Sequence, residues 1–258
     1  MNERELKEAV RQVAEFILES KRIVVFTGAG ISTESGIPDF RSPGGFWERY
    51  TPIYYDEFLS SHEARKSYWQ MHCETSKHWA QSQPNAGHLA IAELERLDKL
   101  DCVITQNVDG LHQGAGNTPE KVIELHGTNR FAECIRCRRR YPMESARARA
   151  EAGEEVPTCD ACGGPLKGAA VFFGEPMPQR ETSEAMRRST VSDLFIVVGS
   201  SLVVYPAADM PMRAKQAGAK LALINLGDTT MDAMADVLLR APAGRALSSI
   251  LDIVRDRL

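Results

Sequence analysis

Short apolar runs alternate with helical patterns along most of this chain, and this alternation limits its fold more than any other feature. The runs are four or five residues long and lie at 23–26, 102–105, 194–198 and 221–224. Continuous apolar runs of this length are typical of strands buried on both faces of a parallel sheet. Amphipathic helical patterns accompany them at 10–18, 86–97 and 207–217. We therefore predict an α/β fold with a doubly wound parallel sheet.

Two segments do not fit this alternation. Residues 44–82 are rich in aromatic residues and show weak helical periodicity, which indicates an inserted, loosely helical subdomain. Residues 131–167 hold four of the six cysteines around a central charged run. A chain of 258 residues has room for one large and one small domain. We predict a sheet domain of residues 1–43, 83–130 and 168–258, a helical insertion of 44–82, and a metal-binding module of 131–167.

The four cysteines of 131–167 form two Cys-x2-Cys pairs separated by 21 residues, and they are Cys134, Cys137, Cys159 and Cys162. This spacing is typical of zinc ribbons, because two knuckles can place four thiolates tetrahedrally around Zn²⁺. Four thiolates leave no coordination position for water, so the zinc is expected to be structural and not catalytic. The other two thiols, Cys73 and Cys102, are predicted to be buried apolar groups.

The charge balance argues against polyanionic partners. Lys and Arg number 31 and Asp and Glu number 35, so the net charge is −4 and nothing global attracts nucleic acid. Arginines crowd the first cysteine pair, but residues 131–167 contain seven basic and six acidic residues. We therefore expect no nucleic-acid partner.

No membrane partner is expected either. The longest apolar stretch, 194–208, is interrupted by glycine, serine and proline, and it is shorter than the ~20 residues that a bilayer requires. Residues 1–20 carry charges throughout and lack the pattern of a signal peptide, so we expect a cytoplasmic protein.

Small and polar residues follow three of the predicted strands, where ligands of such folds gather. Gly28-Ala29-Gly30 would let backbone N–H groups approach a phosphate. Thr33 stands where the third glycine of the dinucleotide-binding pattern would be, so a plain tight turn explains these glycines equally well. Gly199-Ser200-Ser201 follows another strand, and Asn225 follows the last, where its amide could hydrogen-bond a ribose.

Three further segments carry polar side chains that chemistry could use. Thr105-Gln106-Asn107-Val108-Asp109 gathers two amides and a carboxylate after a buried strand, although Asn and Asp also favour turns for local reasons. His126 follows the strand-like run 122–125 and could act as an acid or base near neutral pH. A given histidine among six is more often structural or exposed than catalytic. Asp39-Phe40-Arg41 is consistent with a solvated turn.

Taken together, these motifs resemble those of the sirtuins, the NAD-dependent protein lysine deacylases. The resemblance extends from about residue 20 to 245 and keeps the family's order. It is carried by Gly28-Ala29-Gly30-Ile31-Ser32, Gly36-Ile37-Pro38-Asp39-Phe40-Arg41, Thr105-Gln106-Asn107-Val108-Asp109, His126-Gly127, the four cysteines, Phe173-Gly174-Glu175, Gly199-Ser200-Ser201-Leu202 and Asn225.

The resemblance implies a Rossmann-like NAD-binding domain and a zinc-ribbon domain, with NAD and acyl-lysine entering the cleft between them from opposite sides. The residues that it implies for the NAD site are Ala29, Thr33, Phe40, Arg41, Gln106, Ser200, Ser201 and Asn225. Asn107, Val108 and Asp109 would form the pocket for the nicotinamide amide, and His126 would be the general base. Val171 and Phe173 would hold the acyl-lysine as an added strand.

The implied reaction removes acetyl groups from lysine side chains of proteins. Nicotinamide leaves the ribose, the acetyl oxygen attacks the exposed carbon, and a ribose hydroxyl deprotonated with help from His126 attacks the resulting imidate. The products are free lysine, nicotinamide and O-acetyl-ADP-ribose. The competing hypotheses are a hydride-transferring dehydrogenase, a zinc-ribbon nucleic-acid binder, an NAD sensor without catalysis, and an ADP-ribosyltransferase.

Two positions bear on the acyl group and its strand. Sirtuins that remove succinyl or malonyl groups carry Tyr-x-x-Arg in the helical insertion, whereas Tyr68 is followed here by Met71 in place of the arginine. The sequence therefore predicts a preference for acetyl and other neutral acyl groups. Lys167-Gly168-Ala169-Ala170 departs from the proline and bulkier residues that are common before the Val-x-Phe-Gly-Glu strand.

Overall fold

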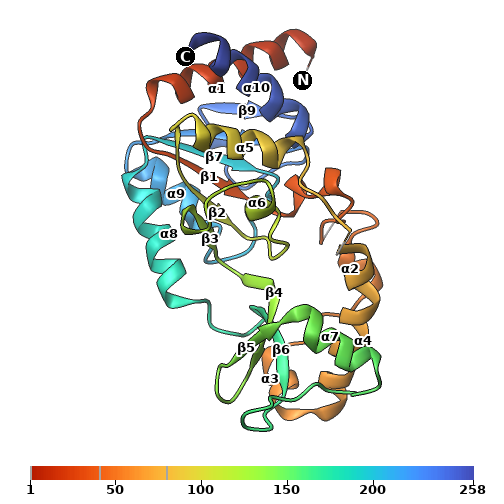
Figure 1. Ribbon diagram of the computed structural model, residues 1–258. Coiled ribbons are helices and arrows are strands. Elements are labelled where there is room, and N and C mark those ends of the chain that lie inside the picture. The colour runs from red at the N-terminus through yellow and green to blue at the C-terminus, as the bar shows by residue number, and fades with distance from the viewer. Residues whose placement is uncertain (1, 41, 80) are drawn as a thin grey trace.

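Two lobes of unequal size make up the molecule (Figure 1). The computed structural model describes residues 2–40, 42–79 and 81–258. The large lobe holds a six-stranded sheet and both chain ends, and the small lobe holds a three-stranded sheet with helices beside it.

The large lobe is built on a parallel sheet, so the predicted Rossmann-like α/β fold is confirmed. The strands, in spatial order, are β3 (Val122–Glu124), β2 (Leu100–Thr105), β1 (Ile23–Thr27), β7 (Leu194–Val198), β8 (Lys220–Ile224) and β9 (Val237–Leu239). Every residue of β1 and β7 is buried, as expected for central strands covered on both faces. The three-residue strand β9 was not predicted, because so short a run carries no periodicity.

Successive residues of β1 point into two different hydrophobic cores. Ile23 and Val25 belong to the core under α1 (Glu3–Glu19), α5 (Ala86–Arg96) and α10 (Ala243–Arg257). Val24 and Phe26 belong to the core under α8 (Gln179–Val191) and α9 (Asp209–Gln216). Because side chains of a strand alternate between faces, one apolar run serves both helical layers. Figure 1 shows α1, α5 and α10 together at the end of the large lobe that is farther from the small lobe.

The small lobe joins the two segments that interrupt the alternation of strands and helices. Its sheet contains β4 (Gly127–Cys134), β5 (Arg140–Pro142) and β6 (Leu166–Ala170), all antiparallel, and its helices are α2 (Phe46–Arg49), α3 (Tyr55–Ser60), α4 (His62–Trp79) and α7 (Met143–Glu151). Trp69 of α4 is buried, and its Nε1 donates to the Leu166 carbonyl oxygen at 3.0 Å. Phe58, Trp69, Met143 and Leu166 share one core, so residues 44–82 and 131–167 pack as a unit.

The two cysteines outside the zinc ribbon differ in burial. Cys102 lies on β2 and is buried, as predicted. Cys73 is only half-buried, so the prediction of a buried group was wrong there. Trp69 and Ser76 of α4 are buried, whereas Cys73, which lies between them along the helix, is only partly covered. Within the described residues no helix is both long and apolar enough to cross a membrane.

Candidate active site

The carboxyl ends of the parallel strands meet at the edge of the sheet that faces the small lobe. The switch point of the sheet lies between β1 and β7, whose following turns contain Gly28, Gly30 and Gly199. A Cβ atom on Gly30 would lie 2.8 Å from the Gly199 Cα, and one on Gly28 would lie 2.8 Å from the Gly199 carbonyl oxygen. Both glycines are therefore required for the two turns to pack together. Ligands of doubly wound sheets bind at this position.

Side chains of neighbouring turns hydrogen-bond across this edge. Gln106, after β2, donates through Nε2 to the Ser200 hydroxyl, after β7, at 2.8 Å. The Gln106 backbone N–H donates to the Thr27 carbonyl oxygen at 2.9 Å. Asn225 follows β8, and its Nδ2 donates to the Gly227 carbonyl oxygen at 2.9 Å. The turns after β2 and β7 are thus bonded to each other, while the Asn225 amide is held within its own turn.

Asn107, Asp109 and Ser32 form a compact polar cluster. Asn107 is buried, and its Nδ2 donates to the Gly28 carbonyl oxygen and to the Ser32 hydroxyl, both at 3.1 Å. Ser32 in turn donates to Asp109 Oδ2 at 2.7 Å, while Asp109 Oδ1 accepts the Leu111 backbone N–H at 2.9 Å. These bonds fix an amide and a carboxylate in one orientation, so the segment is more than a local turn.

His126 lies directly before β4, where the chain passes from the sheet into the small lobe. Its Nδ1 is 3.0 Å from the Gln106 carbonyl oxygen. Since a carbonyl oxygen only accepts, Nδ1 carries the hydrogen and Nε2 keeps its lone pair. Burial lowers the pKa of His126 below its ordinary value of 6.5, and the hydrogen bond to Gln106 opposes this shift. The ring is therefore a neutral imidazole with one basic nitrogen near pH 7.

A cavity of about 1200 Å³ runs between the two lobes. Thirteen residues predicted for the site line it, and they are Ala29, Thr33, Phe40, Gln106, Asn107, Val108, Asp109, His126, Val171, Phe173, Ser200, Ser201 and Asn225. Arg41, also predicted for the site, lies outside the described residues. Residues that are far apart in sequence thus surround one space, large enough for a dinucleotide and a side chain together.

The segment that follows β6 forms one wall of this cavity. The Val171 backbone N–H donates to the His126 carbonyl oxygen at 2.8 Å, and the Phe173 carbonyl oxygen accepts from the Tyr55 backbone N–H at 2.9 Å. Lys167 Nζ lies 2.9 Å from Glu175 Oε2, and the two side chains are only 4% and 9% exposed. This buried ion pair connects β6, which contains Lys167, to Glu175 at the far end of the segment.

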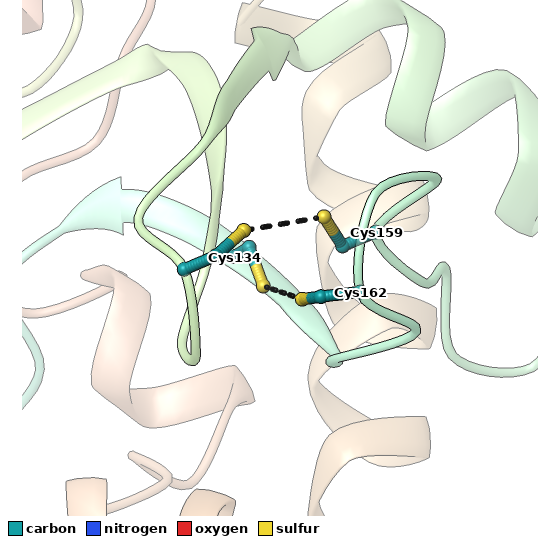
Figure 2. Close-up of side chains that lie close together, drawn as sticks. Cys134, Cys159 and Cys162 are labelled. Atoms are coloured by element: carbon teal, nitrogen blue, oxygen red, sulfur yellow. Dashed lines mark hydrogen bonds between the residues drawn. The ribbon is translucent and has the colours of Figure 1, made fainter.

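The four predicted zinc ligands meet in the small lobe, away from the cavity. Their sulfur atoms all lie within 4.8 Å of one another. Cys134 and Cys162 are 3.5 Å apart at sulfur, as are Cys137 and Cys159, and Figure 2 shows the sulfurs turned toward a common centre. A Zn–S distance of about 2.3 Å implies tetrahedral S–S separations of about 3.8 Å, so the thiols fit a zinc ion.

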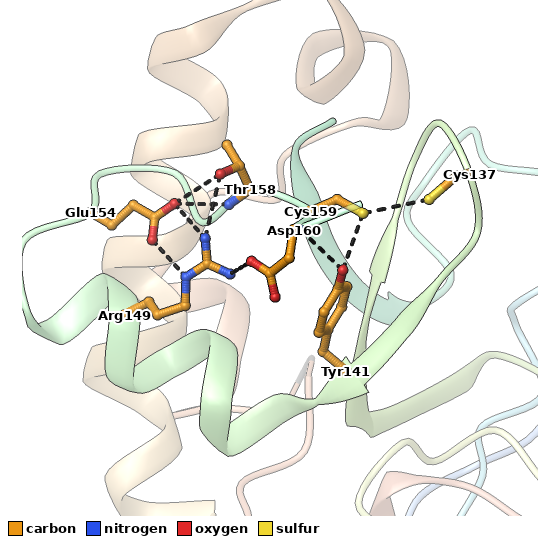
Figure 3. Close-up of polar contacts among 7 residues, drawn as sticks. All are labelled: Cys137, Tyr141, Arg149, Glu154, Thr158, Cys159 and Asp160. Carbon is orange, nitrogen blue, oxygen red and sulfur yellow. Dashed lines mark hydrogen bonds and ion pairs between the residues drawn. The ribbon is translucent and has the colours of Figure 1, made fainter. Parts of the chain in front are cut away.

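Polar contacts hold the second knuckle from outside (Figure 3). The Tyr141 hydroxyl lies 3.1 Å from Cys159 Sγ and accepts from the Asp160 backbone N–H at 3.1 Å. Arg149 of α7 pairs with Glu154 at 2.7 Å and with Asp160 at 3.2 Å. Such outer contacts orient metal ligands, so the knuckle is tied to both β5 and α7.

Ser32 and the Lys167–Glu175 pair are absent from the set predicted from sequence. Ser32 stands beside the glycine turn, and its small hydroxyl in that place was the available signal. The ion pair has no comparable signal, because charged residues eight positions apart are ordinary in an exposed loop. Only burial distinguishes this pair.

Comparison with known proteins identifies relatives of this chain by sequence and by structure. A family model described as the Sir2 family matches residues 28–206. An NAD-dependent protein deacetylase 1 of Bradyrhizobium diazoefficiens is 46% identical, covering 94% of this chain and 95% of the relative. An NAD-dependent protein deacetylase of Thermodesulfovibrio yellowstonii is 45% identical, covering 96% of each chain.

Two solved structures, both Sir2 proteins by description, superimpose along nearly the whole chain. One, described as "Structural Basis for the Mechanism and Regulation of Sir2 Enzymes", has a TM-score of 0.87 at 41% identity and covers 98% of this chain and 100% of that chain. The other, described as "Sir2-p53 peptide-NAD+", has a TM-score of 0.86 at 37% identity and covers 94% of this chain and 97% of that chain.

Proposed function

This chain belongs to the Sir2 family, and on that premise we propose which of its residues carry out the reaction. It is an NAD-dependent protein deacetylase of the sirtuin type that acts on acetyl-lysine in proteins or peptides. Zinc is structural, held by the four cysteines. The observation that carries the proposal is the half-buried imidazole of His126, which lines the cavity beside the polar cluster of Asn107.

His126 is the general base. Its Nδ1–H donates to the Gln106 carbonyl oxygen, which leaves the Nε2 lone pair free to accept a proton from a ribose hydroxyl. Burial keeps the ring neutral, and therefore basic, at physiological pH. Bound NAD supplies an ADP-ribosyl group that takes over the acetyl group after nicotinamide has left.

The polar cluster and the turns divide the task of holding NAD. Asn107, Val108 and Asp109 bind the nicotinamide amide, to whose NH₂ group the Asn107 side-chain oxygen and the Asp109 carboxylate offer acceptors. The turns hold the rest of the dinucleotide through Ala29, Thr33, Phe40, Arg41, Gln106, Ser200, Ser201 and Asn225. The glycines of the turn after β1 let this turn pack against the turn after β7, which brings Ala29 and Ser200 to the same edge of the sheet. Val171 and Phe173 hold the acyl-lysine in extended form between the lobes.

The test of the general base is His126→Ala, assayed by nicotinamide release from an acetylated peptide with and without NAD. Removal of a general base typically costs about 10²- to 10⁴-fold in rate, so turnover should be nearly lost while NAD binding persists. His62→Ala removes an exposed imidazole of α4 and serves as the matched control. Turnover within a few-fold of wild type in His126→Ala would refute the assignment.

Neutral acyl groups are the preferred substrates. Tyr68 and Met71 both line the cavity, and the Tyr68 hydroxyl is occupied by the Gly168 backbone N–H at 2.9 Å. Acetyl-lysine should therefore react faster than succinyl-lysine, and Met71→Arg should shift the ratio of the two rates toward succinyl by about tenfold, the worth of one charge-assisted hydrogen bond. Gln70→Arg adds the same charge at an exposed neighbouring position as a control. Faster succinyl than acetyl cleavage by the wild type would contradict this preference.

The protein acts in the cytoplasm. The four cysteines support this location, because a reducing compartment keeps thiols available for zinc. Fluorescence microscopy of a tagged chain, or cell fractionation, tests it.

A further inference from the structure

Three polar side chains form a buried row beneath the Asn107 turn. Thr27 ends β1, Thr105 ends β2, and His112 belongs to the short helix α6 (Leu111–Gly114). Their exposed fractions are 0%, 3% and 1%. Buried polar groups destabilise a sheet domain unless each has a hydrogen-bond partner. The presence of three such groups at one place therefore needs an explanation.

The row is a continuous chain of hydrogen bonds. His112 Nε2 lies 2.9 Å from the Thr27 hydroxyl, and the Thr27 hydroxyl lies 2.8 Å from the Thr105 hydroxyl. Thr105 Oγ1 then accepts the backbone N–H of Asn107 at 3.0 Å. One end of the chain is therefore an imidazole in the core, and the other is the backbone of a residue that lines the cavity.

The backbone of Asn107 decides where its amide lies. The Asn107 side chain reaches the Gly28 carbonyl oxygen and the Ser32 hydroxyl at 3.1 Å each, close to the upper limit of a good hydrogen bond. A small displacement of the backbone would lengthen both contacts. Helix α6 is bonded to the same turn a second time, because Asp109 Oδ1 accepts the Leu111 backbone N–H at 2.9 Å. The helix and the turn are thus held in register from two sides.

His112 takes part as a neutral ring. Burial, and the nearby ring of His88 at 5.0 Å between centroids, lower the pKa of His112 to about 3. The ring therefore stays neutral across the physiological pH range and keeps its hydrogen-bonding role unchanged there. An apolar side chain of similar size would fill the same space without reaching Thr27.

We propose that His112 is a positioning residue that acts through the hydroxyls of Thr27 and Thr105 to set the backbone of Asn107 and so the affinity for nicotinamide. This inference rests on the proposed role of Asn107 in binding the nicotinamide amide. It assigns a task to three buried side chains that do not themselves line the cavity.

The test separates hydroxyl chemistry from packing. Thr105→Val and Thr27→Val keep the side-chain shape and remove the hydroxyl, whereas Thr105→Ser and Thr27→Ser keep the hydroxyl and remove a methyl group. His112→Phe keeps a planar ring without the donor and acceptor. The readouts are product inhibition by nicotinamide, the KM for an acetylated peptide, and the melting temperature of each variant with zinc bound.

The valine and phenylalanine variants should weaken nicotinamide inhibition about tenfold, the effect of losing one buried hydrogen bond, with an unchanged peptide KM. The serine variants should recover most of the nicotinamide affinity even where they lower the melting temperature. Thr27→Val combined with His112→Phe should weaken inhibition no further than either change alone, because both break one chain. Ser189→Ala removes a buried hydroxyl of α8 elsewhere in the core and should leave inhibition unchanged.

Two results would overturn the proposal. If the serine variants lose nicotinamide affinity and the valine variants keep it, the row serves packing alone. If nicotinamide inhibits all five variants as strongly as wild type but inhibits Asn107→Ala weakly, the row has no influence on the pocket although the pocket is correctly assigned. Normal inhibition in Asn107→Ala would instead refute the proposed function, and the inference with it.

Discussion

At the scale of single residues, the surroundings of each histidine determine what its ring can do. His126 and His112 are both largely withdrawn from water, and burial lowers the pKa of each. His126 bonds to the Gln106 carbonyl oxygen through one nitrogen and lines the cavity, so its other nitrogen is available to a substrate. His112 bonds to Thr27 within the core. The same side chain is therefore able to accept a proton in one place and is a fixed hydrogen-bond partner in the other.

The lowered pKa of His126 predicts where activity is lost in acid. The base works only when neutral, so kcat/KM should fall as pH drops through a pKa that lies below the ordinary 6.5. More than half of the maximal kcat/KM should therefore remain at pH 6.5. The measurement is initial rate at low peptide concentration between pH 5 and 8. Enzyme returned from each pH to neutrality should regain full activity, which separates titration from acid unfolding. A half-maximal point above 6.5 would contradict the prediction.

At the scale of elements, the turns and loops are held by contacts that differ in kind. The turns after β1 and β7 pack closely because Gly28 and Gly30 lie against Gly199 and Ser200. The segment after β6 is held by charge, because Lys167 Nζ contacts Glu175 at 2.9 Å and also donates to the Ala170 carbonyl oxygen at 2.8 Å. Glu175 additionally accepts the Phe172 backbone N–H at 3.0 Å. The ion pair thus fixes the wall that the acyl-lysine is proposed to contact.

Glu175→Gln should therefore destabilise the protein strongly. It leaves the Lys167 ammonium buried without its counter-charge, which typically costs about 3–5 kcal/mol. The urea midpoint of unfolding measures this loss. The double change Lys167→Met with Glu175→Gln should recover much of it, because no unpaired charge remains. Glu3→Gln breaks the exposed pair with Lys7 and should shift the midpoint little. Equal midpoints for Glu175→Gln and wild type would show that the pair contributes nothing.

At the scale of the whole molecule, the small lobe depends on contributions from two distant segments. The strands next to the cysteines provide Leu166, and the helical segment provides Phe58 and Trp69 to the same core. Strand β4 begins beside His126 and ends at Cys134, so the cysteine cluster is joined directly to the candidate active site. Loss of zinc should therefore disturb the cavity wall as well as the ribbon.

Removal of zinc by a strong chelator should abolish deacetylation and open residues 131–167 to limited proteolysis. Cys137→Ala should have the same effect and should lower the zinc content measured by atomic absorption. Cys73→Ala removes a thiol outside the cluster and should keep one zinc per chain. A zinc-free protein that retains full turnover and protease resistance would show that the metal does not support the cavity.

Much of this protein is determined locally and could be predicted from sequence. The buried strands β1, β2, β7 and β8 have continuous apolar runs, because both of their faces are covered and no polar alternation is needed. The zinc ligands could be recognised from the spacing of the cysteines alone, since two Cys-x2-Cys pairs supply all four ligands. Gln106, Ser200 and Asn225 line the cavity and closely follow parallel strands, and parallel strands end at one edge.

Other features depend on which distant residues meet, and only the tertiary structure decided them. The shared core of the small lobe joins residues about 100 positions apart. Neither segment has a hydrophobic pattern of its own that would reveal this packing in the sequence. Cys73 is only partly covered, and the Lys167–Glu175 pair and the His112 row are polar groups in the interior. Local sequence patterns record preferences within a few turns of chain, whereas burial of a polar side chain is set by the partner that packing brings to it.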